Sequence, residues 1–119
     1  MRLATICSFL LLAAFTRVEA HAFLDHAEPA VGSKVTAAPS EIKLWFSEKL
    51  EPALSKVQVF SGDGKLVEKQ TQKPGADTAL AIVSVPPLKP GKYKVVWKAV
   101  SVDTHVTKGD FSFEVVPTK

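Results

Sequence analysis

Three residues near the two ends of this chain have the chemistry of metal ligands: His21, Asp103 and His105. His21 follows an apolar leader, and we expect cleavage directly before it. Cleavage would leave a free α-amino group and an imidazole on one residue, and these two nitrogens can close a chelate ring on one metal ion. Asp103 and His105 are two residues apart, so on an extended backbone their side chains point to the same side. The spacing therefore predicts a shared site if the two ends of the chain meet.

The leader has the three parts of a secretory signal. Arg2 supplies a short positive region, and residues 3–15 are almost wholly apolar. This apolar run is too short for the roughly 20 residues that a membrane-spanning helix needs. Val18 and Ala20 stand at the two positions that the cleavage rule reserves for small residues. We therefore expect a cleaved signal peptide at residues 1–20 and one exported domain at residues 21–119.

The composition of residues 21–119 excludes several classes of site. The only cysteine, Cys7, and the only methionine, Met1, lie in the leader, so the domain can form no disulfide and no sulfur-ligated metal site. Its thirteen lysines are spread along the chain and it has no arginine, which argues against nucleic-acid binding. A metal site must use nitrogen and oxygen, which suit Cu(II), Zn(II) or Ni(II) but not Cu(I).

The rest of the chain consists of short alternating segments separated by glycine and proline turns. No helical period is evident after residue 20, and this pattern is typical of an all-β domain. We expect a seven-stranded Greek-key β-sandwich or barrel. The predicted strands are 22–26, 42–46, 55–61, 65–71, 78–85, 92–101 and 111–115.

The strand at 92–101 positions two of the three candidate ligands. Its odd-numbered residues, such as Trp97, form the apolar inner face, and the same parity carries Asp103 and His105 to the rim of the sandwich. His21 can reach them if the first strand begins at this rim. The set would contain the amine and imidazole of His21, the imidazole of His105 and the carboxylate of Asp103. Three nitrogens and one oxygen in a tetragonal plane suit Cu(II).

Two other polar residues have a less specific pattern. His26 has the opposite parity to His21 on the first predicted strand, so we interpret it as a surface or edge residue. Glu48 follows the strand at 42–46. From the residues alone it is a solvated carboxylate at the rim, and the alternative is an acceptor that orients a ligand nitrogen.

The order and spacing of several short motifs resemble the CopC family of periplasmic copper-resistance proteins, which includes the YobA-like members. The resemblance covers essentially all of residues 21–119. The motifs that carry it are His21-Ala22, Pro29-Ala30-x-Gly32-Ser33, Leu44-Trp45-Phe46-Ser47-Glu48, Leu88-x-x-Gly91-x-Tyr93-x-Val95-x-Trp97-x-x-x-Ser101, Asp103-Thr104-His105 and Gly109-x-Phe111-x-Phe113.

This resemblance implies a cupredoxin-like, immunoglobulin-like sandwich in the periplasm. We expect the protein to act as a monomer without catalysis. It implies that His21, Asp103 and His105 bind Cu(II), and that Glu48 supports one of these ligands. Some family members carry a second, methionine-rich Cu(I) site, which a domain without methionine cannot form. The resemblance also suggests an inner-membrane partner, a CopD-like copper transporter.

Two other functions share part of this pattern. A copper monooxygenase with a histidine brace uses the same amine-plus-imidazole chelate, but an aspartate ligand leaves less open coordination for oxygen chemistry. The other alternative is a metal-free immunoglobulin-like interaction module.

Overall fold

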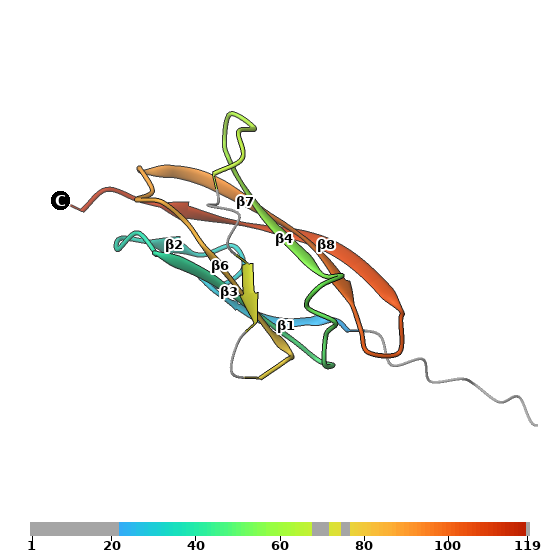
Figure 1. Ribbon diagram of the computed structural model, residues 1–119. Coiled ribbons are helices and arrows are strands. Elements are labelled where there is room, and N and C mark those ends of the chain that lie inside the picture. Colours follow the sequence, from blue (N-terminus) through green and yellow to red (C-terminus); the bar gives the residue numbers. More distant parts are fainter. Residues whose placement is uncertain (1–21, 68–71, 75–76, 119) are drawn as a thin grey trace, which may run out of the picture.

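The computed structural model describes residues 22–67, 72–74 and 77–118. His21 and the leader lie outside the described residues. The chain forms two four-stranded sheets packed face to face (Figure 1). The strands are β1 (Leu24–Glu28), β2 (Lys34–Val35), β3 (Glu41–Phe46), β4 (Lys56–Ser61), β5 (Gln72–Pro74), β6 (Leu80–Ser84), β7 (Gly91–Val100) and β8 (Val106–Val115).

The chain passes repeatedly from one sheet to the other. The first sheet has the order β1-β3-β6-β5, and the second has the order β2-β8-β7-β4. All neighbouring strands are antiparallel except β2 and β8, which pair in parallel. The predicted all-β sandwich is confirmed. In the part of the chain that the structure describes, no helix is long and apolar enough to cross a membrane.

The core lies between the two sheets because the inner strands alternate with a period of two. In β3, the residues Ile42, Leu44 and Phe46 are buried, while their neighbours are half-buried. In β7, the predicted inner residues, including Val95 and Trp97, are buried as expected. The inner residues of β8 that complete the layer are Phe111, Phe113 and Val115.

The last strand is longer than the sequence pattern indicated. It begins at Val106 rather than at residue 111, and it pairs with β7 along its full length. The sequence pattern did not predict the first half of β8, because the inward positions there are Thr107 and Gly109, which interrupt the alternation of apolar residues. This longer hairpin determines where the loop with Asp103 and His105 lies.

The segment after β4 divides between the two sheets. Leu66 forms an isolated bridge with Phe60, so the chain turns back as predicted after the Gly62–Gly64 turn. Residues 68–71 of the predicted strand 65–71 lie outside the described residues. The following β5 pairs with β6 in the first sheet instead. The two-residue β2 was not predicted, because a strand of this length has no detectable period.

Candidate metal centre

Asp103 and His105 lie in the tight turn that joins β7 to β8. The backbone N–H of Ser101 donates to the carbonyl of His105 at 3.0 Å, and the N–H of Thr104 donates to the carbonyl of Ser101 at 2.8 Å. Thr104 has a φ of 73°, in the left-handed region. The two ligands therefore sit on a turn and not on the extended backbone that the parity argument assumed. That detail of the prediction was wrong, yet the turn brings the two side chains together.

The two candidate ligands contact each other directly. Nδ1 of His105 lies 3.0 Å from Oδ2 of Asp103, and the two side chains are 37% and 41% exposed. The hydroxyl of Ser101 donates to the other carboxylate oxygen. This hydroxyl, followed by the His105 contact, lowers the pKa of Asp103 from 3.8 to about 2.

The charge on Asp103 determines which nitrogen of His105 can accept a metal. A carboxylate that is ionised at neutral pH only accepts hydrogen bonds, so its contact favours the imidazole tautomer with the proton on Nδ1. The lone pair then lies on Nε2. A metal ion on Nε2 would lie on the far side of the ring from this carboxylate, so Asp103 could bind the same ion only after turning away from Nδ1.

The start of the described chain lies beside this turn (Figure 1). Ala22 is completely buried, and its carbonyl accepts a hydrogen bond of 2.5 Å from the hydroxyl of Thr107. Thr107 is two residues beyond His105 in β8. Residue 22 is therefore tethered next to the strand that follows the candidate ligands. His21, which lies outside the described residues, is its immediate neighbour in the chain.

Glu48 approaches the same place from a third segment. Leu50 and Ser101 form an antiparallel bridge, and the N–H of Val102 donates to the carbonyl of Lys49 at 3.2 Å. Glu48 directly precedes Lys49, so its backbone lies near the turn that carries Asp103. The Glu48 side chain is exposed, and no hydrogen bond to it occurs among the described residues.

The residue before Glu48 joins this segment to the start of the chain. The N–H of Phe23 donates to the hydroxyl of Ser47 at 2.9 Å, and the N–H of Ser47 donates to the carbonyl of Phe23 at 2.8 Å. Three segments that are far apart in sequence therefore converge at one end of the sandwich. Within the described ranges, no group of three or more histidine, cysteine, aspartate or glutamate side chains could hold a metal.

The third histidine has the surface position that was predicted. His26 lies on the edge strand β1, with its side chain 57% exposed and Nδ1 2.7 Å from Oδ2 of Asp25. Its ring stacks on Trp45 with the ring centroids 4.4 Å apart. Trp45 of β3 is half-buried, and it packs against this exposed histidine.

Sequence reasoning missed the supporting roles of Ser101 and Thr107. A signal for Ser101 was present, because the chain contains a second turn of the same design, Ser61-Gly62-Asp63-Gly64-Lys65. There too, the serine hydroxyl donates to the aspartate, and the serine N–H donates to the carbonyl four residues on. Comparing these turns in the sequence would have indicated that a serine two residues before an aspartate supports it. Nothing in the sequence indicated the long-range bond of Thr107.

Comparisons with known proteins match most of the chain. The family model described as the CopC domain matches residues 24–116. Protein YobA of Escherichia coli (strain K12) is 39% identical over 100 residues, covering 82% of this chain and 81% of that protein. Copper resistance protein C of Pseudomonas syringae pv. tomato is 38% identical over 113 residues, covering 82% of each chain. The crystal structure of PcoC, a methionine-rich copper resistance protein from Escherichia coli, has a TM-score of 0.73 at 35% identity, covering 81% of this chain and 99% of that one.

Proposed function

Because the chain belongs to the CopC family, we propose that it is an exported copper-binding protein that sequesters or delivers copper in copper homeostasis or resistance, without catalysis. Residues 1–20 are removed as a signal peptide, and residues 21–119 act in the periplasm. One Cu(II) is held by the amine and imidazole of His21, by Asp103 and by His105. Two relatives are named copper resistance proteins, and these names support copper as the bound metal.

The observation that carries this proposal is the hydrogen bond from Thr107 to the carbonyl of Ala22. It secures the residue adjacent to His21 to the strand that begins one residue after His105. A residue spans at most about 3.6 Å of extended chain, so we expect a mature N-terminus one residue before Ala22 to be within reach of this end of the sandwich. The tether therefore supports a site made from His21 and the β7–β8 turn.

The donor set supports Cu(II) over Cu(I). Residues 21–119 contain no cysteine and no methionine, so only nitrogen and oxygen donors are available. Asp103 is already ionised at neutral pH, and for it to bind the same ion as Nε2 of His105, its carboxylate would turn away from Nδ1. The proposed role of Glu48 is to accept a hydrogen bond from a ligand nitrogen and orient it. The proposed partner is an inner-membrane transporter of the CopD type. The domain, acting as a monomer, would deliver copper to this transporter or receive copper from it.

A copper titration of the exported protein tests this site. We expect one Cu(II) per chain, with the tetragonal electron paramagnetic resonance signal of nitrogen and oxygen ligands. One alanine inserted before His21 would move the amine off the chelate. The affinity should then fall by more than the roughly 10–100-fold that loss of a supporting residue costs. His105→Ala should have a comparable effect.

His26→Ala is the matched control, because it removes an exposed histidine that contacts Asp25 and Trp45 rather than the site. Its affinity should equal that of the unaltered protein. Glu48→Gln should weaken binding by about tenfold. If protein with His21 confirmed as its first residue by intact mass takes up no Cu(II), the proposal is wrong.

A further inference from the structure

The outer face of the second sheet carries an unusual concentration of positive charge. In β7 the inner residues alternate with Lys92, Lys94 and Lys98, and the neighbouring strands present further lysines on the same face. All six of these lysines are exposed. We call this surface the lysine face, and it consists of Lys34, Lys56, Lys92, Lys94, Lys98 and Lys108.

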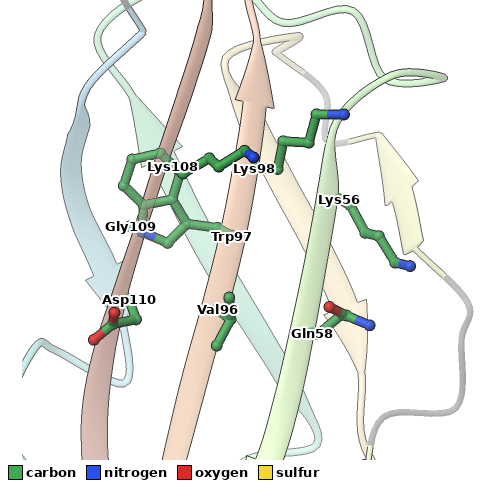
Figure 2. Close-up of a pocket in the computed structure, with 8 residues that line it drawn as sticks. All are labelled: Lys56, Gln58, Val96, Trp97, Lys98, Lys108, Gly109 and Asp110. Carbon is green, nitrogen blue, oxygen red and sulfur yellow. The ribbon is translucent and has the colours of Figure 1, made fainter.

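Three of these lysines stand directly opposite one another across three strands. Lys56 of β4 pairs with Lys98 of β7, and Lys98 pairs with Lys108 of β8 (Figure 2). Directly opposed residues on antiparallel strands have Cα atoms about 4.5–5.5 Å apart, and like charges at such positions destabilise a sheet. No ion pair offsets these three charges within the described residues. Because this row of three lysines destabilises the sheet, we infer that it has a function.

The charge is concentrated on this face rather than spread over the molecule. Two carboxylates, Asp110 and Glu114, lie on the same side of the sheet as the lysine face. The six lysines and these two carboxylates together have a net charge of +4. Among the other residues whose side chains the structure describes, four lysines and eight carboxylates have a net charge of −4. The domain is therefore electrically polarised, with one basic face and an acidic remainder.

The shape and chemistry of the face favour a broad anionic surface over a specific acidic peptide. The hollow along the row, of about 420 Å³, is open, and its lining between the lysines includes Val96, Trp97 and Gly109 (Figure 2). Residues 21–119 contain no arginine, whose planar fork recognises carboxylates in pairs. Lysines are flexible point charges, and they suffice for attraction to anionic lipid headgroups.

We propose that the lysine face docks the exported domain on a membrane surface that contains anionic lipids. The row lies close to the candidate metal centre, because Lys108 is three residues beyond His105 and only two residue pairs separate the Lys98–Lys108 pair from the turn. Docking by this face would therefore hold the metal centre beside the membrane. The attraction acts through lysine charges and does not require bound copper.

Sedimentation with lipid vesicles tests this docking in metal-free protein purified after export. The protein should bind vesicles of phosphatidylethanolamine and phosphatidylglycerol at low salt, and bind them far less at about 0.15 M salt. It should not bind phosphatidylcholine vesicles. The triple variant Lys56→Gln, Lys98→Gln, Lys108→Gln should bind about a hundredfold more weakly, at about fivefold for each lysine.

A matched triple variant separates the lysine face from net charge. Lys43→Gln, Lys65→Gln and Lys89→Gln remove the same charge from other surfaces, and this protein should bind the anionic vesicles nearly as well as the unaltered chain. Replacing the row by arginines should preserve binding. Equal losses in both glutamine variants, or binding to polyglutamate without binding to vesicles, would overturn the proposal. Copper titration should be unchanged in all variants, so this test is independent of the proposed metal site.

Discussion

At the scale of single residues, the candidate site differs from its counterpart turn in the residue that adopts the left-handed conformation. The turns at Ser61–Lys65 and Ser101–His105 share their hydrogen bonds, and each places its fourth residue in the left-handed region. In the first turn this residue is Gly64, with a φ of 83°, whereas in the second it is Thr104, with a φ of 73°. A β-branched residue is costly in this conformation. The strain therefore lies between the two proposed ligands.

Thr104→Gly should relieve this strain. We expect the metal-free protein to gain about 1 kcal/mol in its free energy of unfolding, measured by denaturant titration. Glycine also gives the turn more conformational freedom, so Cu(II) affinity should fall. Gly64→Thr is the mirror-image control: it should destabilise the fold and leave copper binding unchanged. A Thr104→Gly protein that is less stable than the original would contradict the account of strain.

At the scale of elements, the long β7–β8 hairpin connects the core to the site. Within it, Trp97 of β7 stands opposite Gly109 of β8, and the indole occupies the space above the glycine. A Cβ on Gly109 would lie 2.4 Å from Cζ2 of Trp97. The indole also packs edge-on against Phe46 of β3, with the ring centroids 5.2 Å apart. The glycine thus allows a large aromatic ring to pack in the core between the sheets.

Gly109→Ala should therefore force the indole out of its position. We expect a loss of about 1–3 kcal/mol in the free energy of unfolding, because a rigid ring in a packed core can move only by displacing its neighbours. Gly62→Ala serves as the control, since its Cβ would meet only the carbonyl of Lys92 at 3.4 Å, an ordinary contact. Equal stability of the two variants in thermal unfolding would show that the hairpin accommodates the methyl group.

At the scale of the whole molecule, the proposed metal site depends on both export and pH. In the precursor, residue 21 contributes an amide nitrogen, so the amine ligand would exist only after cleavage. The Asp103 carboxylate has a pKa of about 2, below its ordinary 3.8. A lowered pKa stabilises the fold above the ordinary value, and this contribution is lost only as the pH falls through the lowered one. Mild acid should therefore leave the carboxylate ionised and the turn intact.

Copper should consequently leave the protein while the fold persists. We expect Cu(II) affinity to fall below about pH 6, because protons compete for the imidazole and amine nitrogens rather than for the carboxylate. Copper titrations from pH 5 to pH 8, with circular dichroism at each pH, would measure both effects. Carboxyl chemical shifts of the metal-free protein would follow Asp103 directly. Protonation of Asp103 between pH 4 and pH 6 would contradict this explanation.

The sequence alone determined the class of the fold and the inner face of its main strands, because alternation is a local property of the chain. It also limited any metal site in residues 21–119 to nitrogen and oxygen donors, since the absence of sulfur after residue 20 follows from composition. It did not determine that β5 would join the first sheet or that β8 would begin at Val106.

Only the tertiary structure decided how the start of the described chain meets the β7–β8 turn. Pairing depends on hydrogen bonds between residues distant in sequence, such as Thr107 and Ala22, which no local pattern encodes. The contact between Asp103 and His105 follows from a turn, whereas the sequence argument assumed an extended strand. The residue types could therefore be read from the sequence, while their convergence at one end of the sandwich required the fold.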